Sequence, residues 1–131
     1  MDETDAKLLD ILRKDGRRSF VAIAEQLGVT EGTVRNRVRT LVAAGIIQRF
    51  TIRERLIEGL VLIRATGIGL ASLGQAVAKN AEDVYEISGE FDLAARVTAV
   101  TLDELNKKID RIRATKGVRA TLTAIRLGDA I

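Results

Sequence analysis

Residues 19–45, SFVAIAEQLGVTEGTVRNRVRTLVAAG, contain the features that decide the fold of this chain. Ser19 can cap a first helix, and Gly28 follows where a left-handed backbone ends it. The inner side of that helix is predicted to be Phe20, Ile23, Ala24 and Leu27. Thr30 can cap a second helix. The second helix has its apolar residues at helical spacing, at Val34, Val38, Leu41 and Val42. Two short helices joined by a tight turn predict a helix-turn-helix.

The second of these helices carries three arginines and no acidic residue between Thr33 and Thr40. With its apolar stripe turned inward, its outward residues are predicted to be Thr33, Arg35, Asn36, Arg37, Arg39 and Thr40. Arginine can bind a phosphate through two donors or pair with guanine, and asparagine can pair with adenine. We therefore expect this helix to bind double-stranded DNA in the major groove, although a basic run can also be a solvated surface. Further contacts to the DNA backbone are expected from Arg17, Arg18, Arg49 and Arg53.

Charge and composition agree with a nucleic-acid partner and exclude several kinds of chemistry. Up to Arg55 the chain has eleven basic and eight acidic residues, whereas the remainder has ten of each. Without Cys or His it has no disulfide, no thiol nucleophile and no His-ligated metal site, so we expect no metal and no cofactor. No uncharged apolar run approaches the roughly 18 residues of a membrane span, and the acidic N-terminus lacks signal-peptide features. We expect a cytoplasmic protein without a membrane partner.

The order of patterns along the chain predicts an α+β protein with two domains. A helix over residues 5–14, capped by Thr4, precedes the helix-turn-helix, and the alternation over 46–53 predicts a strand after it. We expect a DNA-binding domain over 1–52, a charged linker over 53–58 and a second domain over 59–131. The second domain is predicted to contain strands over 60–65, 83–88, 93–100 and 118–127, and helices beginning at Leu70 and Leu102. This is the βαββαβ order of ferredoxin-like folds.

The two faces of the predicted sheet differ in what covers them. The helices should cover one face, and in the last strand Val118, Ala120, Leu122 and Ala124 are predicted to point toward them. The other set is predicted to point away: Arg119, Thr121, Thr123, Ile125 and Leu127. Because the first strand is apolar on both sides, the uncovered face is expected to have a partner. We expect a homodimer that packs sheet against sheet.

Residues 2–47, DETDAKLLDILRKDGRRSFVAIAEQLGVTEGTVRNRVRTLVAAGII, resemble the N-terminal domain of the leucine-responsive/asparagine-type (Lrp/AsnC) regulators. Residues 89–92, GEFD, and 117–127, GVRATLTAIRL, resemble the amino-acid-sensing domain of that family. The resemblance implies a winged helix-turn-helix followed by a βαββαβ ligand-sensing domain, assembled as dimers and often octamers. In the family, amino acids bind near dimer–dimer contacts and alter assembly or DNA affinity. The chain departs from the family pattern at Thr40, often basic, and at Val42, often acidic.

The resemblance also implies an effector site, on Gly89, Glu90, Phe91 and Asp92 with Thr121 and Thr123. Read without it, a G-x-x-D segment is equally a hairpin turn, and threonines are common in strands. The sequence favours a sequence-specific DNA-binding transcriptional regulator that responds to an amino acid or related metabolite. The alternatives are an architectural DNA-binding protein without effector and a partner that binds DNA only in mixed oligomers. An enzyme is not expected, because no nucleophile and base stand out as a pair.

Overall fold

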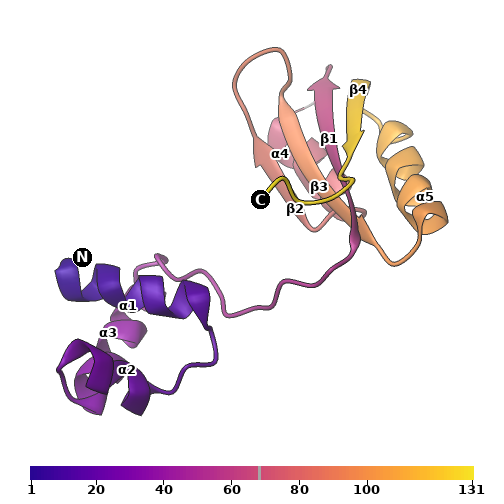
Figure 1. The fold of residues 1–131 in the computed structure, drawn as a ribbon. Coiled ribbons are helices and arrows are strands. Elements are labelled where there is room, and N and C mark those ends of the chain that lie inside the picture. The colour runs from indigo at the N-terminus through magenta and orange to yellow at the C-terminus, as the bar shows by residue number, and fades with distance from the viewer. Residues whose placement is uncertain (68) are drawn as a thin grey trace. The chain divides into compact units, whose positions relative to one another are not determined.

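The computed structural model describes residues 1–67 and 69–131. The chain folds as two compact units, Met1–Arg53 and Glu54–Ile131 (Figure 1). Each unit has its own hydrophobic core, so each is described by itself.

The N-terminal unit consists of α1 (Glu3–Lys14), α2 (Phe20–Leu27) and α3 (Glu31–Ala43). Its core is made of Leu8, Leu9, Ile23, Ala24, Val34, Val38 and Leu41. The expected caps of α2 and α3 are confirmed: Ser19 Oγ accepts from Ala22 N at 3.1 Å, and Thr30 Oγ1 accepts from the N3 backbone amide at 3.2 Å. Gly28 has a φ of 69°, the left-handed conformation that ends α2. The predicted cap of α1 is wrong, because Asp2 and not Thr4 caps that helix, which begins at Glu3.

The strand predicted over residues 46–53 is wrong, because the structure has no strand there. After α3, the amides of Ile46 and Ile47 both donate to Leu41 O, at 3.0 and 3.1 Å, and the chain then continues without regular structure. A strand needs a neighbour to satisfy its backbone groups. The described residues of this unit include no other strand with which residues 46–53 could pair. The alternation of apolar and polar residues over 46–53 is therefore not sufficient to form a strand.

The C-terminal unit contains β1 (Ile57–Ala65), α4 (Leu70–Ala78), β2 (Asp83–Glu86), β3 (Leu93–Ala99), α5 (Leu102–Arg113) and β4 (Val118–Ile125). The four strands form an antiparallel sheet in the order β2-β3-β1-β4, and the predicted βαββαβ arrangement is confirmed (Figure 1). Both helices pack on the same face, because Leu73 and Val77 of α4 share a core with Leu105 and Ile109 of α5. The buried side chains of β1 in that core are those of Val61 and Ile63.

The orientation predicted for most of β4 is wrong. Thr123 pairs with Val61 and Thr121 with Ile63, and paired residues of neighbouring strands point to the same face. Because Val61 and Ile63 lie beneath the helices, the two threonines also lie on the helix side, whereas Leu122 points to the open face. A register irregularity at Arg64/Ala65 keeps Val118 packed against the core as predicted. A register shift of one residue exchanges the two faces of a strand, and β4 has no strongly apolar side to prevent it.

Candidate nucleic-acid interface and sensing site

The exposed face of α3 is rotated relative to the one that the sequence predicted. Val34, Val38 and Leu41 are buried, but Val42 is 45% exposed. The buried stripe is therefore rotated toward Arg37, which precedes Leu41 by one turn and is half-buried. The predicted DNA-binding residues of this helix that are exposed are Arg35, Asn36, Arg39 and Thr40. Thr33 is also half-buried.

The three arginines of α3 have different surroundings. Arg35 pairs with Glu31, one turn earlier on the same exposed surface. Arg37 donates from Nη1 to Asp2 Oδ2 at 2.6 Å and to Asp5 Oδ1 at 3.2 Å. Arg39 is exposed and has no ion-pair partner within the parts of the chain that the structure describes. The expectation that all three guanidinium groups project freely from α3 is therefore met by Arg39 alone.

The hydroxyl groups of the two threonines in this set already have partners. Thr40 Oγ1 donates to Asn36 O at 3.0 Å, and Thr33 Oγ1 lies 2.9 Å from Thr30 Oγ1. A contact to a phosphate or base would replace or extend these bonds. The Asn36 side chain is exposed on the same surface and is better placed for a new contact.

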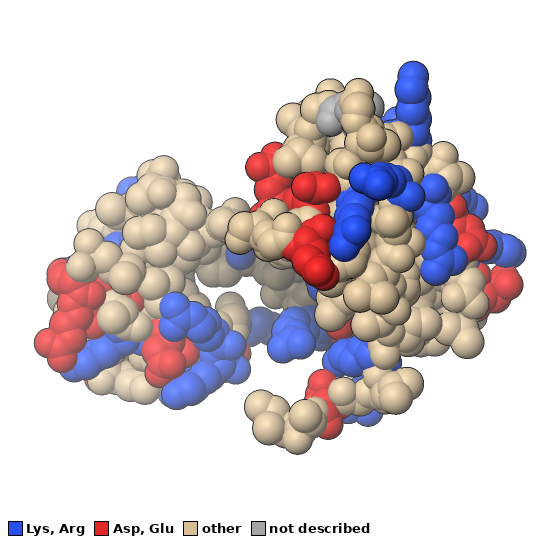
Figure 2. All heavy atoms as spheres, turned by 90° about the horizontal axis from the view of Figure 1, so that it is seen from above, with Lys and Arg blue, Asp and Glu red and all other residues tan. Residues whose placement is uncertain are grey.

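Arg17 and Arg18 lie in the turn between α1 and α2, and both are exposed. Asp15 orders this turn, because its side chain accepts from Arg17 N at 3.1 Å and its carbonyl from Arg18 N at 3.2 Å. Lys and Arg side chains gather along one edge of the N-terminal unit, at the left of Figure 2, with acidic side chains among them. The unit thus offers a basic but not uniformly positive surface.

The turn predicted to bind an effector joins β2 to β3 at one end of the sheet. Its last residue, Asp92, is held firmly: Oδ2 accepts from Ala65 N at 2.7 Å, and Asp92 N donates to Ile63 O at 2.8 Å. Asp92 O also accepts from Ile87 N at 3.0 Å, which closes the turn. Gly89 takes a φ of 116°, which favours glycine. One role of Asp92 is therefore to fasten the turn to the end of β1.

Arg64 also contacts this turn and was not among the residues predicted for the site. Its guanidinium lies 5.1 Å from the centre of the Phe91 ring and 4.0 Å from Glu90 Oε2. In the sequence, Arg64 is a basic residue at the end of an otherwise apolar segment. This position points to the turn only once the structure shows that β1 ends beside it. Arg64 and Glu90 offer opposite charges next to an aromatic face.

The structure does not bring Thr121 and Thr123 together with this turn. Strand β1 lies between β3 and β4, and both threonines point to the helix side. Arg113 Nε donates to Thr121 Oγ1 at 3.4 Å, and the buried Thr123 Oγ1 has no partner among the described residues. Within one chain the six predicted effector residues therefore occupy two separate places.

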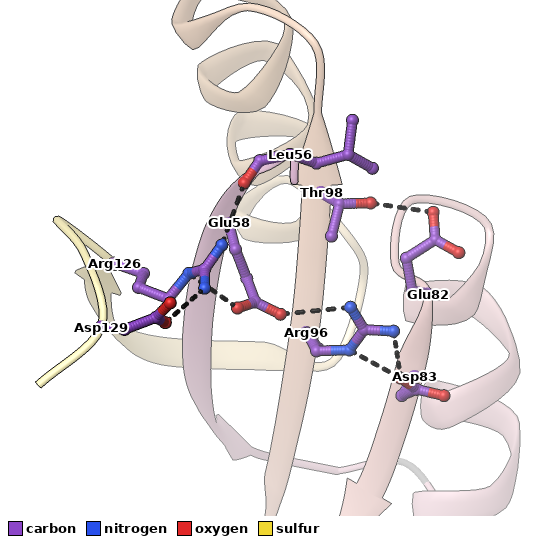
Figure 3. A network of polar contacts seen from close by, with 8 residues as sticks. All are labelled: Leu56, Glu58, Glu82, Asp83, Arg96, Thr98, Arg126 and Asp129. Atoms are coloured by element: carbon purple, nitrogen blue, oxygen red, sulfur yellow. Dashed lines mark hydrogen bonds and ion pairs between the residues drawn. The ribbon is translucent and has the colours of Figure 1, made fainter. Parts of the chain in front are cut away.

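The open face of the sheet combines an apolar part with a network of charges. Leu60 and Leu122 are 52% and 56% exposed, and Leu62 is half-buried beside them. At one end of the same face, Glu58 lies between Arg96 and Arg126, at 3.1 and 3.3 Å (Figure 3). Arg96 also pairs with Asp83 at 2.7 Å, and the hydrogen bonds that it donates, first to Asp83 and then to Glu58, raise the pKa of Arg96.

The described residues lack two kinds of structural feature. They contain no group of three or more His, Cys, Asp or Glu residues placed to hold a metal ion. None of their helices combines the length and apolar character that crossing a bilayer requires.

Comparisons with known proteins point to one kind of protein. Residues 1–42 match the AsnC-type helix-turn-helix domain. The HTH-type transcriptional regulator LysM of Saccharolobus solfataricus is 36% identical over 131 residues, covering 95% of this chain and 92% of its own length. LysM of Sulfurisphaera tokodaii is 35% identical over a similar range, covering 95% and 94%. Among solved structures, the leucine response regulatory protein LrpA of Mycobacterium tuberculosis has a TM-score of 0.81 at 25% identity, covering 100% of this chain and 95% of LrpA.

Proposed function

Because the chain belongs to the Lrp/AsnC family of transcriptional regulators, we propose that it binds specific sequences in double-stranded DNA and that an amino acid or a related metabolite adjusts its assembly or its DNA affinity. The relatives that cover nearly the whole chain are HTH-type transcriptional regulators, which implies a regulatory and not an enzymatic role. The observation that carries the DNA-binding part is the exposed surface of α3, where Arg39 is unpaired among the described residues and Arg35 is paired only with its helical neighbour.

The DNA interface proposed from this surface consists of Arg35, Asn36 and Arg39, with Arg17 and Arg18 contacting the DNA backbone. Thr33 and Thr40 would add contacts if their hydroxyls donate to phosphates. The ion pair of Arg35 with Glu31 is exposed, so a phosphate can replace the carboxylate at small cost.

Gel-shift titration of Arg35→Ala and Arg39→Ala tests this interface. Each change should weaken binding by about 1–3 kcal/mol if the arginine reads a base, and leave the fold intact. Arg119→Ala is the matched control, since it removes the same charge from an exposed position in the C-terminal unit. Equal affinities of all three variants and the unaltered protein would remove the basis of the proposal. Strong salt dependence without discrimination between sequences would favour an architectural role instead.

We further propose that two chains pack through the open faces of their sheets. Leu60, Leu62 and Leu122 form an apolar strip that one chain leaves half exposed. The charges at the end of the same face are already paired within the chain, so covering them leaves no unpaired Arg96 or Glu58. A face with these properties suits a second copy of itself, related by a twofold axis.

The proposed effector site is centred on the turn at residues 89–92 together with Arg64. An α-amino acid carries a carboxylate for the guanidinium and an ammonium group for Glu90, which now face each other at 4.0 Å. Thr121 and Thr123 would contribute from a neighbouring chain of an assembly, because β1 lies between them and the turn of their own chain and they point to the helix side.

Calorimetry with each of the twenty amino acids tests the effector proposal on the full chain. Arg64→Gln and Glu90→Gln are suitable variants, since both side chains are exposed and neither holds the backbone. Asp92→Ala is less informative, because it also removes the acceptor of Ala65 N. Absence of heat with every amino acid, from protein that binds DNA, would refute the effector and leave the DNA-binding proposal standing.

A further inference from the structure

The N-terminus of α1 contains a closed set of hydrogen bonds that includes α3. Asp2 Oδ1 accepts from Asp5 N at 2.9 Å, and Asp5 Oδ2 accepts from Asp2 N at 3.1 Å. The other oxygen of each carboxylate accepts from Arg37 Nη1, at 2.6 and 3.2 Å. All four carboxylate oxygens are therefore used, two to cap α1 and two to hold the arginine.

Part of this arrangement is more protected than an ordinary surface ion pair. The Arg37 side chain is 33% exposed and that of Asp5 only 13%, whereas that of Asp2 is 57% exposed. The hydrogen bond from Arg37 is the main cause of a lowered pKa of Asp2, and the bonds to both carboxylates raise the pKa of Arg37. The partners are 35 and 32 residues apart in the chain, so the contact joins two different helices.

We infer that Arg37 is a positioning residue for DNA binding and not a DNA contact: it holds α3 against the capped N-terminus of α1. This inference rests on the proposed DNA-binding function. Val34, Val38 and Leu41 fix the depth of α3 in the core, but apolar packing restrains rotation and sliding less than directed bonds do. A guanidinium bonded to two carboxylates at the end of another helix supplies that restraint.

A phosphate contact by Arg37 would have an added cost. Moving the guanidinium to a phosphate would leave Asp2 and Asp5 as two neighbouring carboxylates without their cation. These carboxylates would also repel the approaching DNA. Arg39 has no carboxylate partner within the described residues. Replacing Arg37 and replacing Arg39 should therefore affect DNA binding in different ways.

The decisive variant is Asp2→Asn combined with Asp5→Asn, studied in the full chain. Asparagine retains a side-chain oxygen for capping, so α1 keeps its cap while the charges that hold Arg37 are lost. The matched control is Glu3→Gln combined with Asp10→Asn. It removes two acidic charges from the same helix, where they pair only with lysines of α1. Both variants therefore have the same net charge.

Affinity is measured by fluorescence anisotropy with a duplex that the unaltered protein has enriched from a random pool. We expect the Asp2/Asp5 variant to bind about three- to tenfold more weakly than the control variant. If Arg37 contacts phosphate, releasing it from its carboxylates should instead make the Asp2/Asp5 variant bind at least as tightly as the control, and that result would overturn the inference.

Arg37→Gln supplies a second and independent measurement. If Arg37 contacts a phosphate, Arg37→Gln should reduce the magnitude of the negative slope of log affinity against log salt by about 0.9, whereas loss of a positioning residue leaves that slope unchanged. In the Arg37→Gln background, the Asp2/Asp5 changes should cause no further loss relative to the control changes, because the partner is already absent. A slope of smaller magnitude, or losses that add fully, would overturn the inference. If the unaltered protein binds no DNA at all, the proposed function itself fails, which is a distinguishable result.

Discussion

Replacing Leu122 by glutamate should separate the proposed dimer into monomers. Leu122 lies in β4 on the open face of the sheet and pairs with Leu62 of β1. The residue is 56% exposed in the single chain, so we expect its replacement to disturb the fold of the single chain little. The change therefore tests the contact between chains and not the stability of the unit.

The size of the effect follows from burial. Burying a whole leucine side chain contributes about 1.5–3 kcal/mol, and since roughly half of Leu122 remains to be covered, about 1 kcal/mol is lost per chain. A twofold interface contains the residue twice, which doubles the loss. Each buried, unpaired glutamate adds at least about 1 kcal/mol more. A total of roughly 4 kcal/mol corresponds to about a thousandfold weaker association.

Sedimentation equilibrium over a wide range of protein concentration measures this directly. Leu102→Glu is the matched control, because Leu102 is 51% exposed but begins α5 on the other side of the sheet. The control should keep the mass of the unaltered protein, whereas Leu122→Glu should show the mass of a single chain. Identical mass distributions for the two variants would refute the sheet-to-sheet dimer.

Three further outcomes are expected. Asp92→Asn should destabilise the C-terminal unit by about 1–2 kcal/mol in urea and speed hydrogen exchange at the Ala65 amide, because a charged acceptor is lost; unchanged exchange would contradict this role. Gly28→Ala should cost about 1 kcal/mol in the same assay, since alanine resists a φ of 69°, and a neutral result would show that the turn adapts. Because Arg37 lowers the pKa of Asp2 in the folded state, their pairing stabilises fully above about pH 4 and is lost as the pH falls through the lowered pKa. Thermal melts of Asp2→Asn should therefore show a smaller loss of stability on acidification than the unaltered protein shows.

Elements whose signals are local were predictable from the sequence. The caps at Ser19 and Thr30 and the left-handed Gly28 each act within one helical turn, and α2 and α3 form where they were expected. The i,i+4 pair of Asp103 with Lys107 in α5 is local in the same way, and it forms at 2.9 Å. Neighbouring residues carry these signals, so a single sequence suffices to read them.

Features that depend on distant partners were decided by the tertiary structure. Residues 46–53 alternate like a strand but have no strand to pair with in their unit, and β4 takes the register that places Thr121 and Thr123 beneath the helices. The residue type of Arg37 and its place in α3 suggest a DNA contact, yet its guanidinium binds two carboxylates that lie more than thirty residues away in the sequence. The sequence places Asp92 in a turn. Only the tertiary structure shows that its carboxylate accepts a hydrogen bond from the amide of Ala65 at the end of β1 and so holds the turn to that strand. In each case the deciding contact is made across the fold, and periodicity along the chain carries no record of it.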